Sequence, residues 1–321
     1  MVFKRLLGAI GVGGPSVDTV LDSAVVVPGG AVSGRVWLKG GSTAAEIEHI
    51  GLELLARVEA EHEDGESEGA VVFERLTVGG GFRLGEEEER EVPFSVPVPW
   101  ETPVTELYGQ PLGIVLGVRT EVGVAGARDK GDLDPLTVGP LPVQEAVLEA
   151  LGQLGFGFRS ADLEYGRICG TGQRLPFYQE VELTPAPQYA HAVNEIELTF
   201  LASPSGLEVV LEADKHGGPF SSGHDALTRF TVRHEDVPAL DWNGEVDGWI
   251  RRLIAHREAY GAHATYGHVE HHGHDDRHHR GPGLGTAVAA GAAGLALGAV
   301  GGMVAAEVVD EIGDFFEGEE D

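Results

Sequence analysis

Apolar and polar residues alternate along most of the first 124 positions of the chain. The alternation is clearest at residues 32–38, 50–60, 92–98 and 114–122. A period of two predicts strands with one buried and one solvated face. Clusters of turn residues such as Pro28-Gly29-Gly30 separate these stretches, and no long helical pattern interrupts them. The first part of the chain is therefore expected to be an antiparallel β-sandwich.

Three prolines mark one of these strands as a special case. Pro93, Pro97 and Pro99 fall in or beside the stretch at residues 92–98. Proline has no N–H to donate to a neighbouring strand, so it is confined to positions where that donor is not needed. We therefore predict that this strand lies at the edge of a sheet.

The spacing of apolar residues changes from alternation to a helical period at the start of the second part of the chain, and alternation then returns. After Pro142, apolar residues at helical spacing continue to residue 154, and a second helical stripe covers residues 241–259. Between these helices, five further alternating stretches predict a second sandwich of similar size. They cover residues 161–168, 177–183, 194–201, 206–213 and 228–234.

These patterns divide the chain into four parts. Residues 1–130 form the first sandwich, and residues 131–258 form the second sandwich with its flanking helices. Residues 259–280 form a His-rich linker, and residues 281–321 form a Gly/Ala-rich apolar segment with an acidic amphipathic end. Residues 126–142, rich in Gly, Asp and Pro, are expected to link the sandwiches. The predicted fold class is all-β, with a few helices and a largely disordered or helical tail.

Several short motifs carry a resemblance to a known family. The stretch Val25-Val26-Val27-Pro28-Gly29-Gly30-Ala31-Val32-Ser33-Gly34-Arg35-Val36 resembles the first hairpin of arrestin-like domains. The opening Phe3-Lys4-Arg5-Leu6-Leu7 and the later Leu175-Pro176-Phe177-Tyr178-Gln179-Glu180 narrow the resemblance to the bacterial sporulation-control protein M family. The resemblance covers about residues 1–255. It departs at Gly30, where many arrestin-like hairpins have an acid.

The resemblance implies two tandem arrestin-like β-sandwich domains and a regulatory function without catalysis. Members of the family are similar to arrestins in acting as protein-interaction scaffolds, in developmental or cell-envelope control. The resemblance supplies no catalytic residues and no cofactor, and the implied partners are other proteins. It does not extend to the tail after residue 255, whose chemistry is considered separately below.

Charge excludes one class of partner. Asp and Glu number 52 against 22 Lys and Arg, so the formal net charge is −30. The acids are spread along the chain, and an anionic surface of this kind repels nucleic-acid phosphates. A single cysteine, Cys169, excludes an internal disulfide, and we expect it to be a buried structural thiol. The N-terminus lacks the pattern of a signal peptide, so the expected compartment is the cytoplasm.

A cluster of histidines is the first candidate for site chemistry. Neutral imidazoles beside carboxylates suit Zn²⁺ or Ni²⁺. The alternative is a solvated linker that gains positive charge below pH ~6.5. A metal-binding or pH-sensing protein is therefore the alternative function. The candidate metal ligands are His268, His271, His272, His274, His278 and His279.

An uncharged run at residues 281–306 is the second candidate. It is long enough to cross a bilayer as a helix, although it consists mostly of Gly and Ala. Small residues recur every four positions, which lets two helices approach closely, in a membrane or by self-association. The alternative is a flexible tail. The small residues of this face are Ala290, Gly294, Gly298, Gly302 and Ala306.

The end of the chain forms a third pattern. Val308, Val309, Ile312, Phe315 and Phe316 share one helical face, and five acids between residues 307 and 317 fill the other. Anionic membranes repel such a segment. A groove on a partner or on the protein's own core is the better docking place.

Catalytic constellations are absent or weak in the sequence. The chain contains no P-loop and no H-E-x-x-H motif. We therefore expect a protein that is not an enzyme, and predict a non-catalytic regulatory scaffold.

Overall fold

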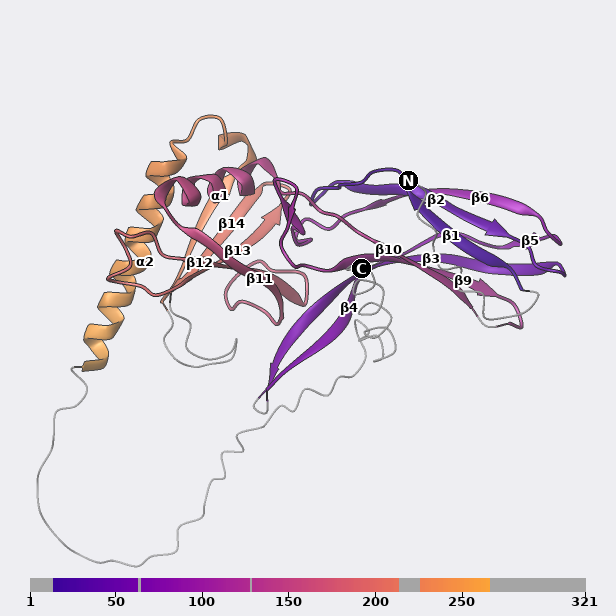
Figure 1. Cartoon of the computed structure of the whole chain (residues 1–321), viewed down its shortest axis with the longest axis horizontal. Helices are drawn as coiled ribbons and strands as arrows, with labels where there is room; N and C mark the ends of the chain where they lie inside the picture. The colour runs from indigo at the N-terminus through magenta and orange to yellow at the C-terminus, as the bar shows by residue number, and fades with distance from the viewer. Residues whose placement is uncertain (1–13, 63–64, 128, 214–225, 266–321) are drawn as a thin grey trace, which may run out of the picture.

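The computed structural model describes residues 14–62, 65–127, 129–213 and 226–265 (Figure 1). Within these residues the chain forms two halves, placed end to end. The apolar spacing of residues 3–10 predicts a short helix, and these residues lie outside the described part of the chain.

Two sheets enclose the core of the first half. One has the order β1-β2-β6, and in the other β3 pairs with β9, β4 and β5, while β10 pairs with β9. Their inward side chains, such as Val36, Leu52 and Val118, are fully buried. The strands are β1 (Ser16–Leu21), β2 (Ala31–Lys39), β3 (Ala45–His62), β4 (Gly65–Gly79), β5 (Phe82–Leu84), β6 (Glu89–Pro97), β7 (Glu106–Leu107), β8 (Gln110–Pro111), β9 (Leu116–Val124) and β10 (Lys130–Pro135).

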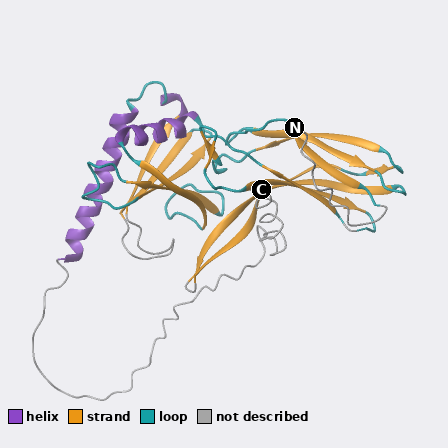
Figure 2. Ribbon diagram, viewed as in Figure 1, coloured by secondary structure: helices purple, strands orange, loops and turns teal. Residues whose placement is uncertain are grey.

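The second half consists of one antiparallel run of strands with helices on one face (Figure 2). Leu151 and Ile250 from the helices pack against Leu198 and Val209 from the strands, which makes a separate core. The elements are α1 (Pro142–Leu154), β11 (Gly157–Tyr165), β12 (Phe177–Thr184), β13 (Ile196–Ser203), β14 (Gly206–Ala213), β15 (Ala226–Arg233), the 3₁₀ turn η1 (His234–Asp236) and α2 (Trp242–Thr265).

Local chemistry sets both ends of α1. Pro142 occupies its first turn, where a missing N–H costs nothing. The Gln144 side chain accepts a hydrogen bond from the Leu141 N–H at 2.8 Å. At the other end, Gly155 adopts a left-handed conformation with φ of 97°, which terminates the helix. The helix predicted from Pro142 to residue 154 is confirmed.

The all-β class is confirmed, and so is the edge strand. Among the strands that the structure describes, β6 pairs with β2 alone, and it contains Pro93 and Pro97. The linker predicted at residues 126–142 is wrong in part, because β10 lies within it and pairs with β9. The second helix continues to Thr265, past the start assigned to the His-rich linker.

A long hairpin joins the two halves. β3 and β4 have 18 and 15 residues, longer than the sandwich needs. The far end of β3 pairs in parallel with β11, with Glu59 opposite Glu164. Phe177 and Leu163 of the second half therefore pack into the first core, beside Val58 of β3. The halves share one hydrophobic contact region.

No described helix is both long and apolar enough to cross a membrane. The uncharged run at residues 281–306 lies outside the described residues, so its membrane or packing role stays a prediction.

The shared core predicts a large cost for removing Phe177. Its side chain is only 1% exposed, so Phe177→Ala is expected to lower the free energy of unfolding by about 3–5 kcal/mol. Phe158→Ala is the matched control, because Phe158 is 51% exposed and its loss is expected to cost about 0.5 kcal/mol or less. Urea unfolding of both variants measures the difference. Equal costs would contradict a core that joins the halves.

Candidate functional site

A cavity of about 830 Å³ opens between the two halves. We call it the interdomain cleft. Its first-half wall includes Phe73 of β4 and the loop after β6, with Trp100 and Glu101. Its second-half wall includes the β13–β14 turn and the loop before β12, with Arg174. This volume lies in the range of sites that bind small molecules or short segments of chain.

A β-bulge aims one aromatic wall residue at the second half. Leu54 of β3 is opposite Glu74, and the next residue, Leu55, is opposite Val72. Phe73 is therefore the extra residue in β4, and such bulges redirect a side chain. Its ring meets the Phe177 ring edge-on, with centroids 5.6 Å apart. The apolar wall of the cleft thus continues directly from the shared core.

Trp100 is clamped between the halves. On one side its ring covers Gly29, whose φ of +74° belongs to a turn. On the other side its ring lies against His234, with centroids 5.4 Å apart. His234 Nε2 lies 2.8 Å from the Ser203 carbonyl oxygen, which holds the imidazole in place. These contacts hold the indole in position at the cleft.

Two polar ties hold the walls at a defined separation. The Glu101 carboxylate accepts hydrogen bonds from the Arg174 and Leu175 N–H groups, at 2.7 and 2.9 Å. The Gln179 amide donates to the Val104 carbonyl at 2.8 Å and accepts from the Val104 N–H at 2.9 Å. Each tie fixes backbone rather than a mobile side chain, so the cleft is formed in advance of any ligand.

The loop that carries Arg174 is organised around a buried glutamine. The Gln173 amide donates to the Gly166 and Leu175 carbonyls at 2.8 and 2.9 Å, and its oxygen accepts from the Ile168 N–H at 2.9 Å. Buried polar groups with all their partners in place give rigidity. Arg174 is therefore presented from a fixed loop.

Cys169 also lies in this loop, and the prediction for it was wrong. We expected a buried thiol at a strand end, but Cys169 is exposed. β11 ends at Tyr165, and the chain then leaves the sheet before Cys169 is reached. The apolar pattern that runs into Ile168 hides this turn.

Two arginines, Arg174 and Arg233, line the cleft together with Glu74, Glu101 and Glu208, in a chain whose net charge is −30. Arg229 lies next to this lining on β15. Arg229 lies 3.4 Å from Glu208, and Arg233 pairs with Glu235 and Asp236 at 2.7 and 3.0 Å. The hydrogen bonds that the Arg233 guanidinium donates to Asp236 raise the pKa of Arg233. Arg174 is exposed, and no described carboxylate forms an ion pair with its guanidinium. It is the cation available to an anionic ligand.

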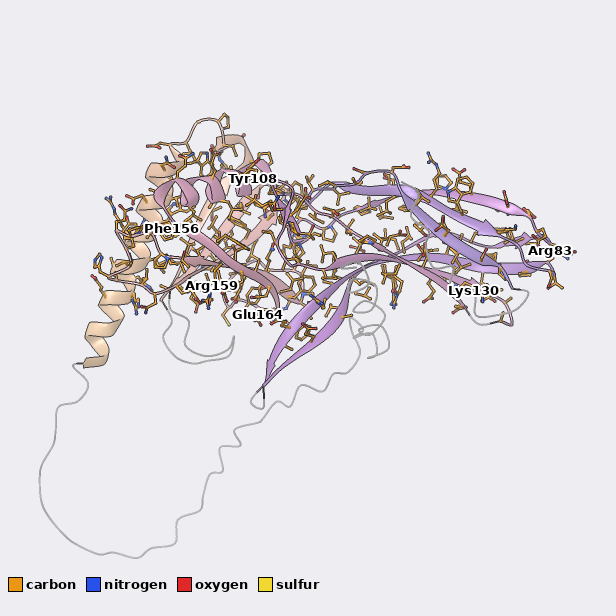
Figure 3. The ribbon with its side chains drawn as sticks, viewed as in Figure 1. Arg83, Tyr108, Lys130, Phe156, Arg159 and Glu164 are labelled. Atoms are coloured by element: carbon orange, nitrogen blue, oxygen red, sulfur yellow. The ribbon has the colours of Figure 1, made fainter. Side chains whose placement is uncertain are left out.

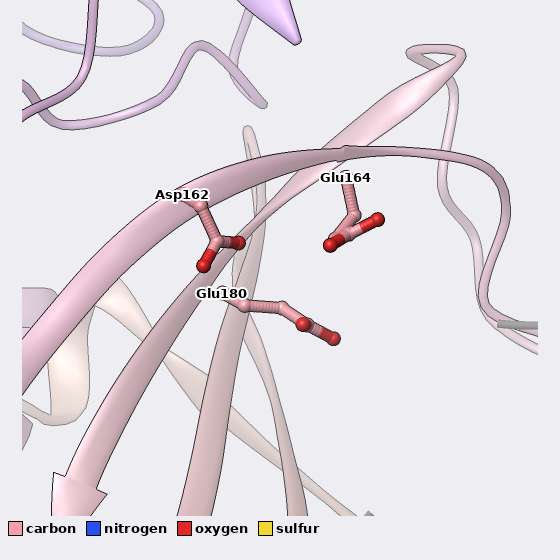
Figure 4. Close-up of side chains that lie close together, drawn as sticks. All are labelled: Asp162, Glu164 and Glu180. Carbon is pink, nitrogen blue, oxygen red and sulfur yellow. The ribbon is translucent and has the colours of Figure 1, made fainter. Parts of the chain in front are cut away.

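A group of carboxylates from β11 and β12 lies close together in the second half (Figure 4). Asp162 and Glu164 of β11 and Glu180 of β12 each place an oxygen within 4.8 Å of the others. Oxygens at this spacing suit Ca²⁺ or Mg²⁺. All three residues have further interactions within the chain, and the spacing of acidic oxygens is by itself no evidence of a bound ion. We therefore assign no metal site to the cluster.

The carboxylates have a measurable consequence for Tyr178. Its side chain is buried, and burial is the main reason that the pKa of its phenol is raised. The nearby charges of Glu180 and Glu164 raise that pKa further, because they oppose a second negative charge. Tyr178 therefore stays neutral at alkaline pH.

The structure does not place the residues singled out from the sequence. The six candidate metal ligands lie outside the described residues, and so do the five small residues of the 281–306 run; both stay predictions. Conversely, sequence reasoning missed the cleft. Phe177 and Glu180 were noticed only as parts of a family motif, and no periodicity marks Phe73, Trp100 or Arg174 as neighbours.

The clamp on Trp100 predicts that Gly29 tolerates no side chain. A Cβ at Gly29 would lie 2.4 Å from the indole and would also strain a left-handed backbone. Gly126→Ala is the control, because Gly126 has φ of +71° with open space around it. We expect a cost of about 1–2 kcal/mol for the control and a clearly larger one for Gly29→Ala. Thermal unfolding compares them, and equal shifts would exclude a tight Trp100 contact.

The raised pKa of Tyr178 predicts a loss of stability in alkali. Above pH ~10 the unfolded chain releases the phenol proton while the folded chain keeps it, so stability falls as the pH rises. Tyr178→Phe has no phenol proton to release, so it lacks this pH-dependent loss of stability, which is at most about 1.4 kcal/mol per pH unit. Urea unfolding at pH 8 and pH 11 measures it. Wild type should lose more stability than Tyr178→Phe between these values, and identical losses would refute the burial of a neutral phenol.

Comparison with known proteins identifies the relatives of this chain. The sequence model described as SpoOM protein matches residues 3–217. The sporulation-control protein spo0M of Bacillus subtilis is 36% identical over 214 residues, which cover 66% of this chain and 80% of that protein. The crystal structure of Spo0M from Bacillus subtilis superposes with a TM-score of 0.67 at 29% identity, over 76% of this chain and 99% of that one. The chain therefore belongs to the SpoOM protein family.

Proposed function

We propose that this protein is a non-catalytic regulatory scaffold in sporulation control. The support for this role is the family and the similarity to a protein of Bacillus subtilis named for sporulation control. We place its action in the cytoplasm and its partners among other proteins. Developmental or cell-envelope control is the process in which we expect it to act.

The interdomain cleft is the part of the molecule that supports binding of a protein segment. It combines apolar walls from Phe73 and Trp100 with the exposed charge of Arg174. Aromatic residues and arginine supply most of the binding energy at protein interfaces. Because the walls are tied to each other before binding, little ordering cost opposes capture of a ligand.

The histidine in the cleft argues for recognition rather than catalysis. His234 Nε2 faces the Ser203 carbonyl, and the ring lies against Trp100. A general base needs its nitrogen on a hydroxyl or a water, and a carbonyl cannot give up a proton. The imidazole is thus used to position the wall.

Charge reversal in the cleft tests the scaffold role. The tagged full-length protein is crosslinked in its own cells, and the captured proteins are identified by mass spectrometry. We expect Arg174→Glu to lower recovery of the main partner about tenfold, which corresponds to about 1.4 kcal/mol. Arg83→Glu is the control, since Arg83 is exposed at the end of the first half far from the cleft (Figure 3).

Two results would contradict the proposal. One is a partner recovered equally with wild type and Arg174→Glu, provided that both variants unfold at the same temperature. The other is equal loss with Arg174→Glu and Arg83→Glu, which would show a general effect of net charge rather than recognition in the cleft.

A further inference from the structure

We propose that the cleft has an occupant within the same chain: the acidic C-terminal segment at residues 307–317. This inference rests on the proposed function of the cleft as a site for protein segments, and adds how the site is regulated. A partner would then have to displace the segment before it binds. Charge, apolar anchors and reach support this occupant.

Charge selects an acidic segment for this cleft. The lining contains Arg174 and Arg233 as well as Glu74, Glu101 and Glu208. Arg233 and the neighbouring Arg229 already form ion pairs, so the exposed Arg174 is the arginine of this wall that an acidic segment can reach. Elsewhere the chain is strongly acidic, with a net charge of −30, so most of its surface repels an anionic segment. Residues 307–317 include five acids and no base. The arginine side of the cleft is the favourable place for them.

Apolar anchors fit the same place. Phe315 and Phe316 are adjacent, and Val308 and Ile312 precede them at helical spacing. Aromatic side chains bury large apolar areas and prefer edge contacts with other rings. Phe73 and Trp100 offer such rings in the walls of the cleft, with Leu175 beside them. The segment thus supplies the apolar groups that these walls need.

The length of the intervening chain suits this docking. α2 begins at Trp242, shortly after Arg233 at the cleft, and its 24 residues extend about 36 Å. Residues 266–306 then separate Thr265 from the segment. A Gly-rich coil of that length has a root-mean-square span of about 35 Å. Because the two lengths match, the local concentration of the segment at the cleft is close to its maximum, in the millimolar range.

Photo-crosslinking in the full-length protein tests this occupant. A benzophenone amino acid replaces Ser205, which is exposed in the β13–β14 turn at the cleft. The same group at Arg83, exposed at the end of the first half far from the cleft, is the control. After irradiation of the purified protein, mass spectrometry identifies the crosslinked peptides. Mixing ¹⁴N- and ¹⁵N-labelled protein separates links within one chain from links between copies.

We expect the Ser205 position to link to residues 307–317 of the same chain, at least tenfold more than the Arg83 position. Arg174→Glu and the double variant Phe315→Ser with Phe316→Ser should each reduce that link about tenfold. In cells, the double variant should raise partner recovery, because the competitor is weakened.

The outcomes separate this inference from the proposed function. Links from Ser205 to other positions of the chain or to a second copy, with none to residues 307–317, overturn it. Equal partner recovery with the double variant and with wild type also overturns the inference that residues 307–317 occupy the cleft. The scaffold role would still be supported in that case if Arg174→Glu lowers partner recovery. The converse outcome is a strong link from Ser205 that depends on Arg174, together with partner recovery that Arg174→Glu does not change. This outcome supports residues 307–317 as the occupant of the cleft and refutes the binding of a partner there.

Discussion

The burial of Phe177 in the core of the first half is the contact on which the arrangement of the molecule depends. It joins a strand of the second half to the long β3–β4 hairpin, together with Leu163. A contact of this size between two sheets acts as a continuous core rather than as a hinge. The walls of the cleft are extensions of it, so their separation is set by packing and not by the conformation of a linker.

The electrostatics of the cleft follow from this rigid setting. Arg174 is an exposed arginine of the cleft whose guanidinium forms no ion pair with a described carboxylate. Its loop is held by Gln173, and the nearby Glu101 is occupied with backbone N–H groups. Fixed backbone geometry thus preserves a positive charge in an anionic protein.

The sequence was informative about strands and helices and uninformative about the cleft, for one physical reason. Alternation and helical spacing are local properties, so β6, α1 and most other elements were predicted near their observed positions. Contacts such as Glu101 with Arg174, or Phe73 with Phe177, join residues far apart in the chain. They depend on register and on loop paths, which periodicity does not encode. The patterns after residue 265 stay predictions.

The bulge at Phe73 makes this position of β4 different from those in the regular ladder. Leu54 is opposite Glu74 and Leu55 is opposite Val72, so deleting Phe73 would keep the pairing on both sides and restore a regular ladder. Val71 would stay opposite Ala56 in the shared core. A deletion within the regular ladder would instead turn every side chain on one side of it to the opposite face. A single-codon deletion at Phe73 would therefore remove an aromatic wall of the cleft and keep the halves of the protein joined.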